Sequence, residues 1–380
     1  MKRITALVLI ACLLLCGCGA KAEAPQAPTE PAAPVQTTAA AATEATEAPT
    51  TEPTAEPTTV PTTEPAPVYR NPLTGFVQEE PWTKRIFAVS IGNGKGSHPH
   101  MGVAVCDVLF ESFVNGSTTR RFAMYSDMAA IEAVGGCRSM RYQFTDMAQA
   151  YDAIAVYAGG SDVVMGDLKT AGINGIIAQQ WGADFHYRDT TRDLEYEHNL
   201  IVKGPEVVAY AQELGYDVTQ DPERDYGFRF TDGAAAPEGG EEAQLVNVAF
   251  TMGSTVKDTT FTYYPDMGVY SLSQYGFEGT DGYYYMVETF KNVFVLLCQN
   301  TNQGSYHVVN TLGSGDGWFA CEGRIIPIRW HRETDTDPFT FTLSDGTPLY
   351  QGIGTSYIAL APTESNVTWS ETAEMNEPNT

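Results

Sequence analysis

The sequence predicts an α+β protein of two domains: an N-terminal α/β domain with a mixed sheet and a C-terminal, mostly antiparallel β domain. Over residues 67–220, apolar runs of strand length alternate with segments whose apolar residues recur at helical spacing. Over residues 245–362, aromatic and β-branched runs are separated by turn dipeptides. Residues 221–244 are rich in Gly and Ala and are expected to form an exposed linker. A body of about 310 residues also exceeds one comfortable core.

In the N-terminal domain, four apolar runs are expected to form strands: residues 87–91, 103–113, 122–125 and 153–157. A helix with one apolar face is predicted by residues at helical spacing: Met140, Phe144, Met147 and Tyr151. A second helix is expected over 162–170 with Ser161 as its N-cap. A third is bracketed by Pro205 in its first turn and Gly215 just past its end.

In the C-terminal domain, six β-branched or aromatic runs are expected to form strands: residues 259–264, 283–287, 292–298, 324–330, 339–343 and 355–360. Asp316-Gly317 and Asp345-Gly346 are typical of hairpin turns. Residues 363–380 form an acidic tail that is expected to be disordered.

The N-terminus indicates a lipoprotein signal peptide over residues 1–17. Lys2 and Arg3 precede an apolar run that is too short to span a bilayer, and Leu15-Cys16-Gly17-Cys18 closes it. These four residues are similar to a bacterial lipobox, so cleavage before Cys18 and lipidation of Cys18 are expected. The protein would then be anchored on the extracytoplasmic face of the bacterial membrane. An ordinary secretory signal with cleavage elsewhere is the alternative.

Residues 18–66 are expected to form a disordered stalk. They contain repeated Thr, Pro, Ala and Glu and no aromatic residue, so they cannot bury enough apolar surface to offset their ordering entropy. The chain carries 47 acidic and 22 basic side chains and a formal net charge of −25. Such a charge repels phosphate backbones and excludes nucleic acid as a partner.

Four cysteines remain in the folded body: Cys106, Cys137, Cys298 and Cys321. An even number permits two disulfides outside the cytoplasm. The apolar runs around Cys106 and Cys298 instead favour buried free thiols. No C-x-x-C pair occurs, so a zinc site is not expected.

Arginines gather in two short stretches of this acidic chain: Arg120, Arg121, Arg138, Arg141, Arg188 and Arg192. Arg138 and Arg141 are expected in the first turn of a helix, where the helix macrodipole disfavours positive charge. An anion between these arginines and the amides of residues 136–139 would remove this penalty. Gly160 and Ser161 open a second helix, which could contribute to the same anion site. The alternative is a structural ion-pair network with Asp107, Glu111 and Asp127.

Catalytic signals are weaker. His98 and His100 flank Pro99 and could hold a metal with His186 or His198, but loop histidines are usually solvated. Asp107 and Glu111 would share one face of a strand as paired acids, about 13 Å apart. Ser139 and Ser161 fit helix caps better than nucleophiles. No cofactor motif is recognisable, because the glycines of residues 91–96 lack the spacing of a phosphate loop.

The order of several short motifs resembles the YerB-like lipoproteins, the family catalogued as DUF3048, over nearly the whole body. In the N-terminal half these motifs are Asn71-Pro72-Leu73-Thr74-Gly75, Thr119-Arg120, Arg138-Ser139 with Arg141, Gly159-Gly160-Ser161, Arg188-Asp189 and His198-Asn199. In the C-terminal half they are Lys291-Asn292-Val293, Gly313-Ser314-Gly315, Trp330 and Gly346. The chain departs from the family pattern at Asn115, Gly136-Cys137 and Glu197. The resemblance implies the two-domain architecture and a lipid-anchored location, but no particular activity.

These observations favour an extracytoplasmic lipoprotein that binds an anionic cell-envelope ligand or an envelope protein through the arginines. The alternative is a hydrolase or transferase of envelope polymers that uses His98, His100, His198 or the carboxylates of Asp107 and Glu111. A purely structural role for the arginines is a third hypothesis. The candidate ligand-binding residues are Arg120, Arg138, Ser139, Arg141, Gly160, Ser161, Arg188, His198 and Asn199. No metal ligand and no cofactor are assigned.

Overall fold

The computed structural model describes residues 67–232 and 236–373. The predicted signal peptide, the lipidation site Cys18, the stalk and the last residues of the acidic tail lie outside the described residues. Residues Pro65–Thr380 make up one compact unit of their own. Within the described ranges, none of the helices combines the length and the apolar character that crossing a bilayer requires.

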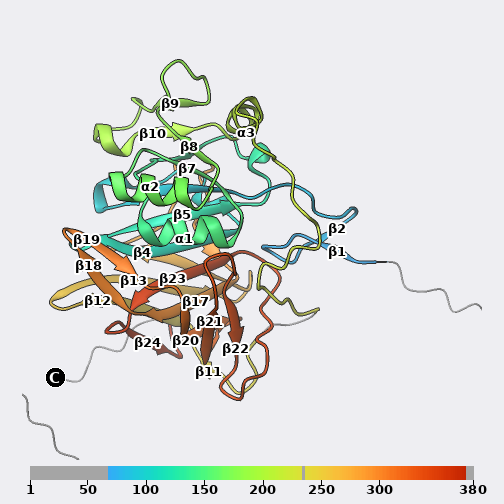
Figure 1. The fold of residues 1–380 in the computed structure, drawn as a ribbon. Coiled ribbons are helices and arrows are strands. Elements are labelled where there is room, and N and C mark those ends of the chain that lie inside the picture. The colour runs from blue at the N-terminus through green and yellow to red at the C-terminus, as the bar shows by residue number, and fades with distance from the viewer. Residues whose placement is uncertain (1–66, 233–235, 374–380) are drawn as a thin grey trace, which may run out of the picture. The chain divides into compact units, whose positions relative to one another are not determined.

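One mixed sheet of eleven strands runs through both halves of the described chain (Figure 1). Its order is β11 (Glu241–Glu242), β21 (Arg324–Arg332), β20 (Gly313–Cys321), β17 (Asn292–Cys298), β23 (Ser356–Pro362), β4 (Val108–Asn115), β5 (Thr118–Tyr125), β3 (Phe87–Asn93), β7 (Ile154–Tyr157) and β8 (Gly175–Ile177). The remaining strand, β22 (Thr340–Thr342), pairs with β21.

The two halves meet where β23 pairs with β4. This pairing is parallel and brings Ser356 opposite Val108 and Leu360 opposite Ser112. β17 and β23 are also parallel, as are β3, β7 and β8, whereas β4, β5 and β3 are antiparallel neighbours. The N-terminal half therefore contributes a mixed sheet, as the sequence predicts, and its edge continues into the sheet of the C-terminal half.

A second, wholly antiparallel sheet belongs to the C-terminal half. Its strands are β12 (Leu245–Met252), β13 (Thr255–Tyr264), β14 (Val269–Gln274), β15 (Phe277–Glu278), β16 (Thr289–Phe290) and β24 (Asn366–Ser370). The pairing of β24 with β12 shows that the expected disorder of the acidic tail is wrong for residues 366–370.

Three smaller sheets complete the β structure: β6 (Val134–Gly135) with β10 (Leu200–Val202) and β9 (His186–Arg188), β1 (Tyr69–Arg70) with β2 (Val77–Gln78), and the hairpin of β18 (Asn300–Gln303) and β19 (Tyr306–Val309). Four short 3-10 helices lie in the loops: η1 (Lys95–Ser97), η2 (Val103–Val105), η3 (Met128–Ala130) and η4 (Tyr196–His198).

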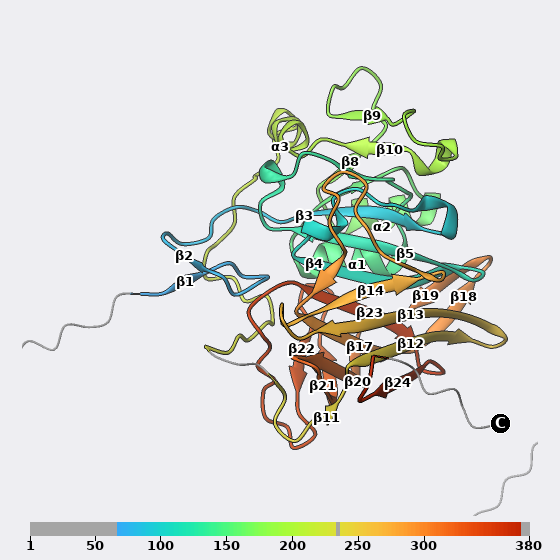
Figure 2. The ribbon, with the colours of Figure 1, turned by 180° about the vertical axis from the view of Figure 1, so that it is seen from behind.

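Two α-helices and the second sheet cover opposite faces of the large sheet. The helices α1 (Tyr142–Ala150) and α2 (Asp162–Thr170) lie in front of it in Figure 1, and strands β12–β14 lie in front of it in the reverse view of Figure 2. The third helix, α3 (Gly204–Glu213), packs against η3. The predicted positions of all three helices are confirmed to within a few residues.

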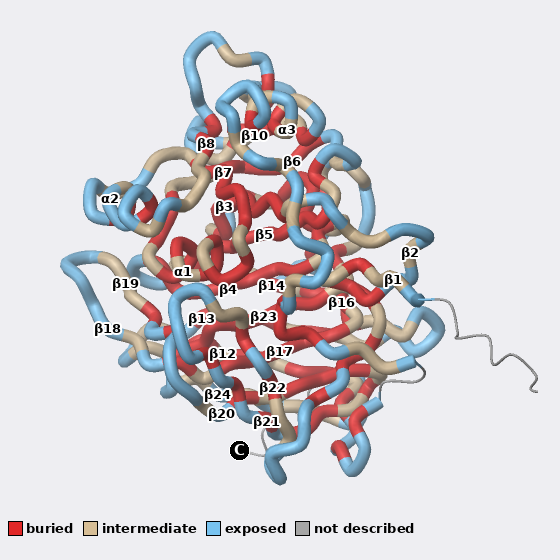
Figure 3. Tube along the Cα trace, turned by 45° about the vertical axis from the view of Figure 1, so that its right-hand side comes forward, coloured by how far each residue is buried: buried red, intermediate tan, exposed pale blue. Residues whose placement is uncertain are grey.

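Alternate residues of the large sheet supply two separate cores. Phe110 and Phe122 belong to a core that includes Phe144 of α1 and Val164 of α2. Their chain neighbours contribute to a second core with the second sheet and α3, which contains Leu109, Ala123, Phe250, Phe261 and Val207. This alternation is the two-residue period of a β-strand that is covered on both faces. Figure 3 shows that the strands at the centre of the molecule are buried.

Some sequence predictions fail where local turn chemistry competes with strand patterning. Residues 283–287 do not form a strand. A turn at residues 282–284 begins where the carboxylate of Asp281 accepts hydrogen bonds from the amides of Tyr283 and Tyr284, each at 2.9 Å, and Val287 makes only an isolated bridge to Thr280. Asp316-Gly317 lies within β20, where the backbone oxygen of Val295 would be 2.5 Å from a Cβ at position 317. The hairpin turns instead at Gly323, with a φ of +71°.

Candidate functional site

Predicted site residues gather where strands β3 and β7 of the large sheet end. Arg120 lies on β5 directly opposite Gly92 of β3. The segment carrying Arg138 crosses the same end, because the Arg138 amide donates to Ser90 at 2.8 Å and the Arg138 carbonyl accepts from Ala158 at 2.9 Å. β3 and β7 are parallel neighbours. The carboxyl ends of such strands are where α/β sheets commonly bind ligands.

The helix that follows this segment begins later than the sequence suggests. α1 starts at Tyr142, Arg141 occupies its N-cap position without a capping side chain, and Arg138 precedes the helix. The amides of Cys137 and Arg138 donate to carbonyls of β10 and β3. The expectation that both arginines occupy the first helical turn is therefore wrong. These two amides are committed to neighbouring strands and do not form an anion site.

Ser139 does not cap a helix, contrary to the sequence prediction. Its carbonyl oxygen instead accepts hydrogen bonds from three side chains: the Arg120 guanidinium, the Arg141 guanidinium at 3.4 Å and the Ser90 hydroxyl at 3.1 Å. The Arg141 guanidinium also donates to the carbonyl of Met140 at 2.8 Å. Two cations thus converge on backbone carbonyls, which carry no formal charge.

Arg120 and Arg141 are buried cations without a counter-ion. Arg120 is 4% exposed and Arg141 is 9% exposed. Neither forms an ion pair with any residue that the structure describes, and the Nε atom of each lacks an acceptor. The ring of Tyr306, on β19, lies 4.9 Å from the Arg141 guanidinium. Burial, followed by repulsion from Arg141 and Arg138, lowers the pKa of Arg120 well below its usual value, and burial lowers the pKa of Arg141.

Arg138 is the arginine of this group that contacts a carboxylate. Its guanidinium lies 3.4 Å from Glu197 Oε2 and donates to the Glu197 carbonyl at 3.2 Å. His198 Nδ1 is 3.3 Å from the same guanidinium, and His198 Nε2 is 3.5 Å from Glu197 Oε1. Burial and the Arg138 charge lower the pKa of His198. The Glu197 side chain itself is 57% exposed.

Arg188 and Arg138 both line a small surface hollow. The Arg188 guanidinium stacks 3.8 Å from the Tyr196 ring centre and donates to Asn199 Oδ1 and Gln179 Oε1, each at 3.2 Å. The hollow has a volume of about 230 Å³. The residues that line it are Cys137, Arg138, Ser139, Ala158, Gln179, Arg188, Tyr196, Glu197 and Leu200.

Other predicted site residues lie outside this hollow. Ser161 caps α2, as predicted, and accepts a hydrogen bond from the Val164 amide at 3.4 Å. Neither Ser161 nor Gly160 lines the hollow. His198 and Asn199 do not line it either, but they contact Arg138 and Arg188 and so help to orient the two guanidinium groups.

The acids that the sequence offers as alternative partners have other contacts. Asp107 accepts hydrogen bonds from the amide and hydroxyl of Ser126. Asp127 pairs with Lys84, and Glu111 pairs with Arg121 and Lys257. Arg192 pairs with Asp189. Ion pairing with these acids therefore does not account for Arg120, Arg138 or Arg141. Asp107 and Glu111 also contact different partners, so the structure does not hold them together as a catalytic pair.

A buried polar network between the two halves was predicted only in part: the sequence offered Glu111 as an ion-pair partner of the arginines, but not Glu288 or Lys257. Arg121 donates to Glu288 at 2.8 Å and lies 3.5 Å from Glu111, which also pairs with Lys257. His100 Nδ1 is 3.0 Å from Arg121. All five side chains are buried. Charged residues inside otherwise apolar strands, such as Glu111 in residues 108–114, are the sequence signal that could have indicated it.

The candidate metal ligands are also constrained by their surroundings. His98 and His100 have ring centres 4.1 Å apart, and burial lowers the pKa of both. His100 Nε2 is 2.7 Å from the carbonyl of Gly92. Glu195, Glu197 and His198 have ligand atoms within 4.8 Å of one another. Since the Arg138 guanidinium contacts two of these three, a cation placed there would be repelled.

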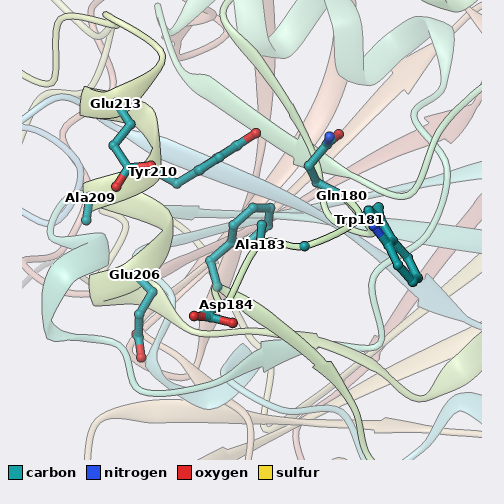
Figure 4. A pocket seen from close by; sticks show the side chains of 10 residues that line it. Gln180, Trp181, Ala183, Asp184, Glu206, Ala209, Tyr210 and Glu213 are labelled. Carbon is teal, nitrogen blue, oxygen red and sulfur yellow. The ribbon is translucent and has the colours of Figure 1, made fainter.

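A second hollow, of about 380 Å³, lies between the loop at residues 180–185 and α3 (Figure 4). The carboxylates of Asp184, Glu206 and Glu213 line it together with Trp181, which is 96% exposed. None of the predicted site residues lines this hollow. Its negative charge makes it unsuitable for an anion, in contrast to the hollow between Arg138 and Arg188.

Comparison with known proteins places the chain among relatives of similar architecture. "Putative lipoprotein YerB" of Bacillus subtilis (strain 168) is 24% identical over 285 residues, which cover 68% of this chain and 80% of that protein. The crystal structure of the YerB protein from Bacillus subtilis has a TM-score of 0.68 at 20% identity and covers 79% of this chain and 99% of its own. This structural likeness shows that the two proteins share a fold.

Two family models match the two halves in order. Residues 73–217 match the N-terminal domain, and residues 246–358 the C-terminal domain, of the family described as "Protein of unknown function (DUF3048)". The N-terminal match includes all of the arginine positions described above. The chain therefore belongs to the YerB-like DUF3048 family and carries both of its domains.

Proposed function

We propose that this protein is a lipid-anchored protein of the extracytoplasmic membrane face that binds an anionic cell-envelope ligand, or an anionic surface of an envelope protein, at its arginine site. The arginine site comprises Arg120, Arg138, Arg141 and Arg188. The observation that carries this proposal is that Arg120 is 4% exposed and has no carboxylate partner among the described residues.

Burying an uncompensated cation costs several kcal/mol, and folded proteins usually pair such groups. The same strand contains a direct comparison. Arg121, the next residue of β5, is equally buried but is held by two carboxylates, Glu111 and Glu288. An anion at the neighbouring site would supply the negative charge that Arg120 and Arg141 lack.

The anchoring part of the proposal rests on the lipobox-like residues 15–18 and on the stalk composition of residues 18–66. The proposed lipid anchoring is also supported by the name of a relative, "Putative lipoprotein YerB". In this proposal the lipidated Cys18 holds the protein at the membrane, and the stalk lets the folded body reach ligands away from the bilayer.

The test is a thermal-shift titration of residues 65–380, the compact unit, with wall-derived anions and peptidoglycan fragments. An anion that binds only the folded state raises the melting temperature of the wild-type protein. An Arg138→Ala/Arg141→Ala variant should lose this rise. Arg229→Ala/Arg329→Ala is the matched control, since it removes two surface arginines that are paired with Asp225 and Asp316.

The control variant should respond as the wild type does. A ligand that raises the melting temperatures of all three proteins equally would bind elsewhere and contradict the assigned site. Flat responses of the wild type to every anion would contradict the proposed function.

A further inference from the structure

We infer that the arginine site takes a phosphate group and that Glu197 is a built-in carboxylate which this phosphate displaces from Arg138. This inference rests on the function proposed above and deepens it. It names the chemical class of the ligand and the residue that competes with the ligand for the site.

The charge of the site favours phosphate over carboxylate. Among the described residues, its four arginines make one ion pair with a carboxylate, the contact of Arg138 with Glu197. Arg188 is held by the Tyr196 ring and by neutral oxygens, so its charge is also uncompensated within the described residues. A carboxylate ligand carries one negative charge, whereas a phosphate monoester carries about 1.5 to 2 at neutral pH. Guanidinium groups also match the oxygen geometry of phosphate through paired hydrogen bonds.

The hollow provides a place for such a group. Arg138 and Arg188 line it from different segments, and Ser139 lines it between them. No described residue is hydrogen-bonded to the Ser139 hydroxyl, so this hydroxyl can donate to a ligand oxygen. Arg120 and Arg141 do not line the hollow, but both donate to the carbonyl of Ser139, so their positive charges lie next to a residue that does line it.

Glu197 has the position and the loose attachment expected of a displaceable competitor. Its carboxylate lies at the rim of the hollow, 57% exposed, and its contact with Arg138 is long at 3.4 Å. Water competes for the exposed Glu197 carboxylate, so this ion pair is weak even though the Arg138 side chain is only 22% exposed. A phosphate can therefore take the place of the Glu197 carboxylate, which then returns to solvent.

The experiment is calorimetric titration of residues 65–380 with inorganic phosphate and with acetate at constant ionic strength. The variants are Glu197→Gln, Arg138→Gln and Glu195→Gln. Glu195 is the matched control, because it lies two residues from Glu197 and forms no ion pair with any described residue. Melting temperatures without ligand confirm that each variant is folded.

Phosphate should bind more tightly than acetate, and Glu197→Gln should strengthen phosphate binding about fivefold, which corresponds to about 1 kcal/mol. Glu195→Gln should stay within about twofold of the wild type, and Arg138→Gln should weaken binding at least tenfold. Equal binding of acetate and phosphate would overturn the assigned ligand class. Wild-type phosphate affinity in Glu197→Gln, or an equal gain in Glu195→Gln, would overturn the displacement by Glu197.

Two further arms identify the source of the phosphate. Soluble glycerol 3-phosphate and phosphatidic acid vesicles carry the same phosphate monoester, free in solution and on a lipid. Binding of either carrier that depends on Arg138 supports the assignment and names the source. Carriers that bind Arg138→Gln as well as they bind the wild type would overturn it. Failure of every anion to bind the wild type and Glu197→Gln would instead contradict the proposed function itself.

Discussion

Arg120 and Arg141 donate to the same backbone oxygen, the carbonyl of Ser139. A carbonyl dipole satisfies hydrogen-bond donors but does not neutralise two positive charges. The arrangement differs from that of Arg121, one residue along the same strand, which is held between Glu111 and Glu288. Adjacent arginines of β5 thus lie in a compensated and an uncompensated environment.

This difference predicts that the same substitution has very unequal effects on stability at the two neighbouring positions. Arg121→Met should lower the free energy of unfolding by about 3–5 kcal/mol, because it leaves two buried carboxylates without their cation. Arg120→Met removes a cation that has no carboxylate partner. Without an added anion it should change the free energy of unfolding by less than about 1 kcal/mol, since one lost hydrogen bond to Ser139 is offset by the relief of a buried charge. Urea unfolding of residues 65–380 measures both.

The contrast between the two variants is the decisive quantity, because both remove a guanidinium from β5 and add the same side chain. Equal losses of stability at positions 120 and 121 would mean that Arg120 has a structural counter-charge and would weaken the anion-site assignment. Phosphate should stabilise the wild type more than Arg120→Met, which links this comparison to ligand binding.

Stability should also depend on pH through Glu111. Burial alone would raise the pKa of this carboxyl, but the charges of Lys257 and Arg121 hold it at about 2, below its ordinary value of 4.5. A carboxyl with a lowered folded-state pKa stabilises the protein above its unfolded pKa and loses this contribution as the pH falls toward the folded pKa. The difference corresponds to about 3 kcal/mol. It should be lost between about pH 5 and pH 2.

Urea unfolding at a series of pH values tests this expectation. In Glu111→Gln, the decline of stability between pH 5 and pH 2 should be shallower than in the wild type. Asp266→Asn is a suitable control, because Asp266 is an exposed carboxylate in a turn. A wild-type slope that is unchanged in Glu111→Gln would show that other acids cause the acid instability.

The elements that the sequence predicts well are those with local signals. Helix α2 begins and ends as expected because Ser161 caps it and its apolar spacing is regular. The start of α1 was misplaced because the preceding amides pair with β3 and β10, which lie elsewhere in the chain. The pairing of β4 with β23 joins residues about 250 positions apart, and no local pattern encodes it.

The same limit applies to the site. Alternation along a strand indicates that Arg120 and Arg121 point to opposite faces of the sheet. It does not indicate which of the two has counter-ions, because Glu288, which pairs with Arg121, comes from the other half of the chain. The sequence shows that Arg120, Arg138 and Arg141 are concentrated in one stretch, but only the fold shows that Arg120 and Arg141 have no carboxylate partner among the described residues, whereas Arg138 contacts Glu197.

The four cysteines of the folded body should be unreactive in the native protein. All four are free and buried, which confirms the expectation of free thiols over disulfides. Burial raises the pKa of Cys137 and Cys321 to about 12, so almost no thiolate forms at neutral pH. For residues 65–380, a thiol reagent should label no cysteine at pH 7.5 and four in denaturant without reductant. Fewer than four after denaturation would reveal a disulfide.

The predicted lipidation of Cys18 can be tested by substituting two nearby cysteines, Cys18 and Cys16. If Cys18 carries the lipid, Cys18→Ser should abolish incorporation of labelled palmitate when the full chain is expressed in a bacterial host. Cys16→Ser is a matched control, since it changes the same atom two residues earlier within the lipobox-like segment. Cys16→Ser should keep the label, because the lipid is expected on the cysteine that becomes the mature N-terminus, which is Cys18. Palmitate label in Cys18→Ser, or its loss in Cys16→Ser alone, would show that the anchor is placed elsewhere.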